Sequence, residues 1–184
     1  MRLSKPRIKP LEQGEWNPEQ QEILQRFAGD EEPKNIFKTL VRYPKLLKRW
    51  LVFANHILGK SSLPPREREL IILRIGWLCR SGYEWNQHVE IAGHCGLSKA
   101  DTERIKEGAD NDQWSSLDKL LLRATDELFN DAFVSDETWS ELAKNYTEAQ
   151  LMDIVFTIGN YNLVSMALNT LGVQMEPTME DSFH

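Results

Sequence analysis

The sequence predicts a single all-α domain of about eight or nine helices. Apolar residues recur every three or four positions along most of the 184 residues, and no convincing run alternates with a period of two. No repeat, low-complexity segment or Gly/Ser-rich linker divides the chain, which is 41% hydrophobic and 27% charged. We expect an N-terminal arm and first helix over residues 1–34, a helical domain over 35–176, and a loose acidic tail over 177–184.

Capping residues and prolines delimit the first three helices. Asn17 followed by Pro18 opens PEQQEILQRFA. Asn35 can cap NIFKTLVRY, and Pro44 ends that helix because the residue before a proline disfavours the helical conformation. Pro44 then begins PKLLKRWLVFANHILGK.

The next two helices are expected to form a hairpin. Leu63-Pro64-Pro65 begins a helix with charge at its N-terminal end and a broad apolar face. The chain should break near Ser81 and Gly82, since glycine is costly inside a helix and permissive in a turn. YEWNQHVEIAGHC resumes as a helix, which Gly96 is placed to end.

Small hydroxyl residues open the remaining four helices. Helical runs follow Ser98, Ser115 or Ser116, Ser135 and Thr147, the last of which has the spacing of a capping box with Gln150. The final helix, LMDIVFTIGNYNLVSMALNTLGV, is apolar on most sides, and such a helix is usually buried all round. In a chain of this size, that burial would use a partner subunit, so we expect a homo-oligomer.

Composition argues against nucleic acid and membranes as partners. The formal net charge is -6, the pI is about 5.3, and the Lys and Arg residues are scattered, so no basic surface invites nucleic acid. The basic start, MRLSKPRIKP, is followed by no apolar run of signal-peptide length, and no window approaches a membrane span. We expect a soluble, cytoplasmic protein that binds a small-molecule substrate.

The two cysteines, Cys79 and Cys95, are too few and too far apart for a disulfide framework or a four-ligand zinc site. Each lies in an apolar helical stretch, where a reduced thiol acts as a small hydrophobe. Neither has a CxxC partner that would lower its pKa.

Acid/base chemistry is indicated in the hairpin. Glu84 and His88 are four apart, so their side chains share one helix face, and a carboxylate beside an imidazole raises its basicity. Tyr83 presents a phenolic donor at the start of the same helix, and tight packing would bring Glu69 back towards it from the preceding helix. The alternative is an ordinary surface pair beside a solvated charge run.

A metal site is a weaker interpretation of the same residues. His56 would join Glu69, Glu84 and His88 as a two-histidine, two-carboxylate set. No second ligand is fixed by local spacing as in HExxH, so we predict neither a metal nor a cofactor.

Several other residues are candidates for the walls of a substrate pocket. Trp85 and Tyr161 would serve there, although large aromatic side chains more often pack the core. Asn160, in an apolar helix, needs a partner, which a backbone group would supply as well as a ligand. His56 fits the core or the edge of a pocket.

The segments LPPRERELIILR, YEWNQH and GLS resemble the carboxymuconolactone decarboxylase family, which shares its fold with the alkylhydroperoxidase D-like proteins. NIFKTLVRYPKLLKRW and IGNYNLVSMALNTLGVQ extend the resemblance over residues 35–176. It implies an all-helical oligomer, a dimer, trimer or hexamer here, with its pocket near the hairpin.

The peroxidase branch of this family has a glutamate followed, after eleven residues, by Cys-x-x-Cys-x-x-x-His. In the present sequence, the resemblance places Glu69 and His88 at the outer positions but Ser81 and Glu84 at the cysteines, with Tyr83 at an intervening histidine. Neither serine nor carboxylate performs dithiol chemistry, so we expect no dithiol peroxidase activity.

The decarboxylase branch implies a different role for these residues. Loss of CO2 from an unsaturated carboxylactone leaves a dienolate, which must be stabilised and protonated. His88 would be the acid/base group oriented by Glu84, with Glu69 as a second proton carrier and Tyr83 as a donor to substrate. The positive charge of Arg74 would offset the negative charges of Glu69 and Glu84, which otherwise disfavour an anionic substrate. Alternatively, Arg74 has a structural role.

We therefore expect a lyase or isomerase that needs no cofactor and acts on a small lactone or organic acid. Two alternatives remain open: a thiol-dependent peroxidase or antioxidant protein using Cys79, and a non-enzymatic oligomer that binds a ligand in the same pocket.

Overall fold

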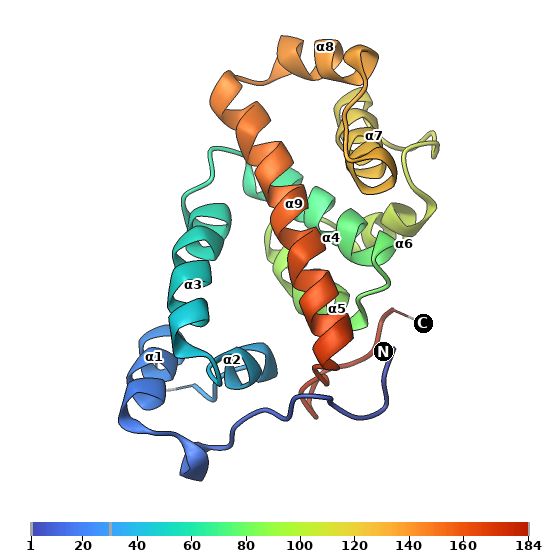
Figure 1. The fold of residues 1–184 in the computed structure, drawn as a ribbon. Coiled ribbons are helices and arrows are strands. Elements are labelled where there is room, and N and C mark those ends of the chain that lie inside the picture. Colours follow the sequence, from blue (N-terminus) through green and yellow to red (C-terminus); the bar gives the residue numbers. More distant parts are fainter. Residues whose placement is uncertain (1, 30, 184) are drawn as a thin grey trace.

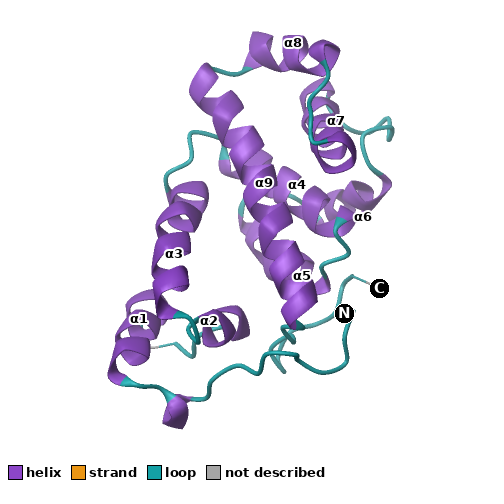
Figure 2. Cartoon of the chain, viewed as in Figure 1, coloured by secondary structure: helices purple, strands orange, loops and turns teal. Residues whose placement is uncertain are grey.

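The computed structural model describes residues 2–29 and 31–183, and these form an all-α fold, as predicted (Figures 1 and 2). A short 3-10 helix, Gln13–Glu15, precedes nine α-helices within the described residues. Their bounds are α1 Pro18–Ala28, α2 Asn35–Leu40, α3 Pro44–Gly59, α4 Pro65–Leu78, α5 Gly82–His94, α6 Lys99–Glu107, α7 Ser116–Asp131, α8 Asp136–Asn145 and α9 Glu148–Leu171.

Helix α4 lies at the centre of the molecule. It packs chiefly against α5, α7 and α9, and every residue from Arg68 to Gly76 is buried. Its leucines and isoleucines form the largest core cluster, together with apolar residues of α5, α7 and α9. The candidate site residues that α4 carries, Glu69 and Arg74, therefore lie in the closely packed interior.

A smaller layer is formed by α1, α2 and α3, which lie beside the lower half of α9 (Figure 1). Leu24, Val41 and Leu47 lie at its own core. A third cluster, built around Tyr83, Val164 and Leu168, joins this layer to α5 and α9. The boundary between the small layer and α5/α9 is where the cavities described below occur.

Most of the expected helix N-caps are confirmed. Side chains of Asn17, Ser98, Ser115, Ser135 and Thr147 accept hydrogen bonds from the third residue of the helix that each precedes. Two expectations need correction. Lys34 precedes α2 and Asn35 is its first residue, and the break between α4 and α5 falls at Arg80, whose φ is 51°, while Gly82 begins α5.

The two ends of the chain pack against the body. In the N-terminal arm, the Arg7 amide donates to the Leu171 carbonyl, and the Leu3 carbonyl accepts from the Gln174 side chain. The tail expected to be loose over 177–184 instead lies along α5 over its described residues: Asn86 accepts from the Ser182 amide, and Phe183 packs against Trp77. His184 lies outside the described residues.

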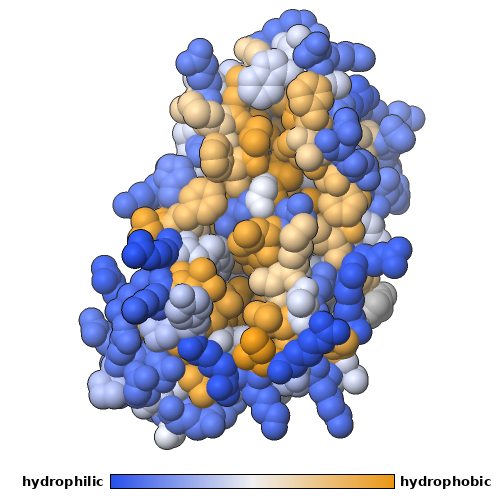
Figure 3. Space-filling model, viewed as in Figure 1, coloured by the Kyte–Doolittle hydropathy of each residue, from blue (hydrophilic) through white to orange (hydrophobic). Residues whose placement is uncertain are grey.

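Helix α9 is long and apolar enough to span a membrane by length and composition alone, contrary to the sequence-based expectation. In the structure it packs against five other helices, and 56% of its most apolar window is buried inside the fold. This burial is typical of the core helix of a soluble protein. Figure 3 shows hydrophobic residues gathered along the face that α9 and α3 share.

Candidate acid/base site

The candidate site is centred on His88, which lies between two carboxylates. Its Nδ1 lies 2.6 Å from Oε2 of Glu69, and its Nε2 lies 3.0 Å from Oε1 of Glu84. Glu69 is fully buried, and the other two side chains are only 6% exposed. The two helices of the hairpin thus bring Glu69, Glu84 and His88 together, as tight packing of α4 on α5 requires.

Arg68 extends this row of charges at its far end. Its Nε donates a 3.3 Å hydrogen bond to Oε1 of Glu69, and its side chain is 11% exposed. Arg68, Glu69, His88 and Glu84 form a buried row of alternating charges that sums to zero when the imidazole is protonated. Pairing of this kind is what allows charges to be buried.

The row keeps His88 protonated. Burial by itself would lower the pKa of the imidazole, but the hydrogen bonds and charges of Glu69 and Glu84 outweigh it and raise the pKa to about 9. At neutral pH, His88 is therefore an imidazolium whose two N–H groups both point at carboxylates. Its protons reach a substrate only through, or beside, one of these carboxylates.

A cavity of about 260 Å³ opens against this row. Glu84 and His88 line it, whereas Glu69 and Arg68 do not. Most of the other walls are apolar and come from α3, α5 and α9, including Leu51, Leu58 and Ile91. We call this the acid/base cavity. Of the two carboxylates, Glu84 is the one that faces its interior.

Two residues of α9 complete the floor of the acid/base cavity. The ring of Tyr161 meets the His88 imidazole edge to face at 4.9 Å, and burial together with the charges of Glu84 and Glu69 raises the Tyr161 pKa well above its ordinary value. Asn160 Oδ1 accepts a hydrogen bond from Trp50 Nε1, which fixes the orientation of the amide. Tyr161 is thus a neutral phenol, and both side chains carry N–H or O–H donors.

The ring of Tyr83 also lines the acid/base cavity, but its hydroxyl is engaged elsewhere. It donates to Oε1 of Glu176 at 2.8 Å and accepts from the Ile36 amide. Burial, followed by the charge and hydrogen bond of Glu176, raises the pKa of Tyr83 well above its ordinary value. The donor that the sequence assigned to substrate is instead bonded to a residue of the chain's C-terminal segment.

One cation stands at the mouth of the acid/base cavity. Lys34, which is exposed, donates to Oε1 of Gln87, and Gln87 in turn donates to Oε2 of Glu176. Lys34 and Gln87 both line the cavity. Two hydrogen-bonding side chains, one of them positively charged, therefore face whatever enters.

Three candidate residues lie away from the acid/base cavity. Arg74 donates to Asp126 and to the carbonyls of Ile105 and Lys106, which is the structural role. Trp85 packs in the core, and its ring nitrogen donates to Ser182. His56 faces Asp153 at 3.1 Å and is half-exposed, so the two-histidine set is not brought together.

The cysteines do not form a pair. Cys79 is buried, its Sγ lies 3.2 Å from Asn162 Oδ1, and burial raises the pKa of its thiol. Cys95 lies at the other end of α5. The side chains of Ser81 and Glu84 occupy the positions that the peroxidase pattern gives to cysteine.

Sequence reasoning missed four residues of the site. Arg68 was visible only as part of the charged run Arg66–Glu69, and the helical period does not say that it turns inward beside Glu69. Lys34, Gln87 and Trp50 reach the cavity through the packing of α2 and α3 on α5 and α9. No local spacing encodes that packing.

The sequence comparison supports the family expected from the motifs. Residues 44–116, which include Glu69, Glu84 and His88, match the model of the carboxymuconolactone decarboxylase family. A search of curated proteins finds no significant match.

Solved structures share the fold over nearly the whole chain. An alkylhydroperoxidase AhpD core protein from Ralstonia eutropha JMP134, described as peroxidase-related, is 16% identical, with a TM-score of 0.80 over 94% of this chain and 93% of that chain. A peroxidase-related protein from Silicibacter sp. TM1040 is 17% identical, with a TM-score of 0.79 over 99% and 100%. A cysteine-to-alanine variant of the debrominase Bmp8, in complex with 2,3,4-tribromopyrrole, is 15% identical, with a TM-score of 0.73 over 95% and 94%.

Identities this low show the fold and nothing of the activity. Residues 44–116 thus match the carboxymuconolactone decarboxylase family model, and the described chain has the alkylhydroperoxidase D-like fold, with a sequence that lacks the CxxC pair.

Proposed function

We propose that this protein is an acid/base lyase or isomerase acting on a small unsaturated lactone or organic acid. The observation that carries the proposal is the buried row Glu69–His88–Glu84, which ends in an apolar cavity where a redox relative would hold two thiols. Proton transfer is the chemistry that such a row supports without a redox group.

The reaction can be written for a carboxylactone. The bond to the carboxylate carbon breaks, CO2 leaves, and the electron pair is delocalised onto the lactone carbonyl as a dienolate. A proton then adds to carbon. The proton on Nε2 of His88 would pass through the Glu84 carboxylate, which faces the cavity, to this carbon, while Glu69 holds Nδ1; His88 would then regain a proton from water once the product has left. The dienolate oxygen would accept from Asn160 or Tyr161.

Substrate charge is accommodated in this scheme by two cations. Arg68 offsets Glu69 within the row, which is the role considered for Arg74 from sequence. Lys34 stands at the mouth, where it would pair with a substrate carboxylate. Without them, two carboxylates would repel an anionic substrate.

The test is an assay of carboxymuconolactone decarboxylation. The reaction is monitored through the release of CO2 and through the incorporation of deuterium from heavy water. Glu84→Gln and His88→Gln should each lower kcat by about 100-fold or more, the usual contribution of a positioned acid/base group. Lys34→Gln should mainly raise KM. Glu90→Gln, which removes an exposed carboxylate from the same helix, is the matched control and should change neither constant.

Two results would contradict the proposal. Full activity in Glu84→Gln and His88→Gln would remove these residues from the chemistry. Peroxide reduction that disappears in Cys79→Ser would instead establish the thiol-dependent alternative, against which the burial and raised pKa of Cys79 argue. Tribromopyrrole, the ligand of the Bmp8 neighbour, is a useful second compound for the same variants.

A further inference from the structure

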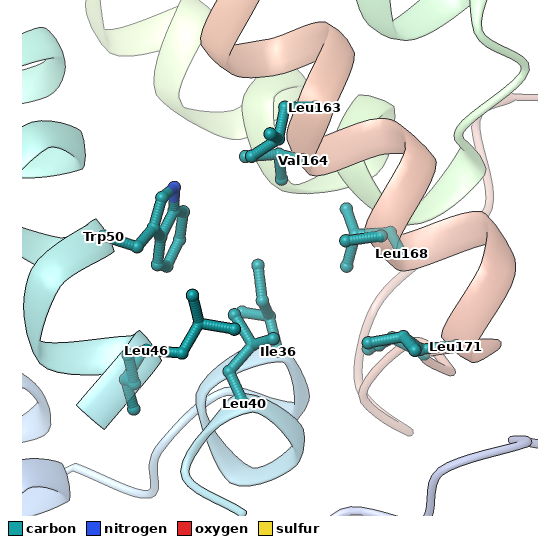
Figure 4. Close-up of a pocket in the computed structure, with 11 residues that line it drawn as sticks. Ile36, Leu40, Leu46, Trp50, Leu163, Val164, Leu168 and Leu171 are labelled. Carbon is teal, nitrogen blue, oxygen red and sulfur yellow. The ribbon is translucent and has the colours of Figure 1, made fainter. Parts of the chain in front are cut away.

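A second cavity, of about 120 Å³, lies beside the acid/base cavity, and we call it the side cavity. All eleven residues that line it are apolar. Figure 4 shows its two walls, with Ile36, Leu40 and Trp50 of the small layer on one side and Leu163, Leu168 and Leu171 of α9 on the other.

The side cavity and the acid/base cavity share part of their walls. Ile36, Trp50 and Val164 line both. The hydrogen bond from Trp50 Nε1 to Asn160 directs the polar edge of the indole towards the acid/base cavity and leaves ring carbons for the side cavity. Of the three shared residues, Trp50 is thus the one that offers a polar edge to the acid/base cavity and apolar carbons to the side cavity.

The size and chemistry of the side cavity limit what can occupy it. An enclosed apolar cavity of about 150 Å³ in another protein binds benzene, so by volume a group of about five or six carbons fits the side cavity, which is slightly smaller and is open at its rim. No lining side chain offers a charge, and the ring N–H of Trp50 is already bonded. Water would therefore be poorly held, and a hydrocarbon group would be held well.

We propose that the side cavity binds the apolar ring or alkyl chain of the substrate whose acidic group reacts at Glu84. This inference rests on the proposed function for the position of the acidic group. It names the substrate class as amphipathic organic acids or carboxylactones carrying an apolar group of about five or six carbons.

A second copy of the chain is the competing occupant, because Leu46 and Leu163 at the rim are about half-exposed. The inner walls favour the substrate. Leu47, Val164 and Leu168 are at most 5% exposed within a single chain, and the three shared residues connect the side cavity inward to the acid/base cavity.

The experiment measures binding of butanoate, hexanoate and octanoate by calorimetry, with methyl NMR to locate the contact. All measurements use Glu84→Gln, so that binding is read without turnover. The dissociation constant should fall about fourfold per added methylene until the side cavity is full. Methyl signals of Leu40 and Leu171, which line only the side cavity, should shift with octanoate and not with butanoate.

Two further variants make the test specific. Ala167→Phe fills the side cavity alone and should remove the gain with chain length while leaving butanoate binding unchanged. Leu171→Ala enlarges the same space and should extend the gain to decanoate. If Ala167→Phe fails to fold, Leu171→Ala still decides the matter.

The proposal is overturned if the acids bind equally or not at all, or if octanoate binding is unaltered by both variants. It is also overturned if Ala167→Phe changes the solution mass, since the cavity would then belong to a subunit contact. If affinity for the acids increases with chain length but the protein decarboxylates no lactone, the side cavity is still a binding subsite and the proposed reaction is wrong. Decarboxylation of carboxymuconolactone by a protein that binds the three acids equally would do the reverse.

Discussion

His88 keeps its proton across the neutral range because both of its ring nitrogens face buried carboxylates. The consequence for stability follows from linkage. The pKa is raised from 6.5 to about 9 on folding, so the stabilisation from His88 is fully present below pH 6.5 and is lost as the pH rises to about 9. The total is on the order of 3 kcal/mol.

We therefore predict that the free energy of unfolding falls by roughly 1 kcal/mol per pH unit between about pH 6.5 and 8.5. Urea titrations at several pH values in this window would measure the slope. In His88→Gln, the slope should be smaller by about the contribution of one bound proton. Equal slopes in the two proteins would show that His88 does not hold its proton as the geometry indicates.

At the level of elements, Arg74 ties α4 to two neighbours. It donates twice to Asp126 of α7 and also to carbonyls at the end of α6, where Gly108 caps the helix with a φ of 97°. A β-carbon on Gly108 would lie 2.7 Å from Arg74 Nη2. Only glycine leaves room for the guanidinium in this backbone conformation.

Gly108→Ala should therefore destabilise the protein by about 2 kcal/mol or more, through the unfavourable φ and the displaced guanidinium. Gly93→Ala is the matched control, since its β-carbon would meet nothing within 4 Å in the last turns of α5. It should be neutral or stabilise by up to about 1 kcal/mol. Thermal unfolding of both variants measures the contrast, and similar melting temperatures would refute it.

For the molecule as a whole, one exposed stripe of α9 remains uncovered. Met152, Phe156, Leu163 and Met166 are each more than half exposed, and with Gly159 they recur in alternating steps of four and three residues. This spacing is typical of a helix-pairing seam. The homo-oligomer expected from the sequence remains a prediction, and this stripe is the contact that we propose for it.

Met166→Glu should consequently lower the mass of the particle in solution, because a charge in an apolar seam is costly to bury. Light scattering coupled to gel filtration measures the mass. Trp139→Glu, which changes an exposed aromatic residue on α8, is the control and should leave the mass unchanged. A wild-type protein that runs as a monomer would contradict the prediction outright.

Sequence reasoning reached the helices and the Glu84–His88 contact because both depend on local spacing. Caps such as Ser98 and Thr147, and the four-residue step from Glu84 to His88, are encoded within a few residues. Lys34 and Trp50 were not predictable in this way. They face the cavity because two helix layers meet there, which depends on the packing of the whole chain.

The buried row from Arg68 to Glu84 limits how the sequence can change in evolution. A substitution that removes one charge leaves an unpaired neighbour in the interior, whereas a compensating second change restores neutrality. Related chains should accordingly alter these positions in pairs, so that an evolutionary step from this candidate acid/base site towards a thiol site passes through coupled replacements and not through single ones.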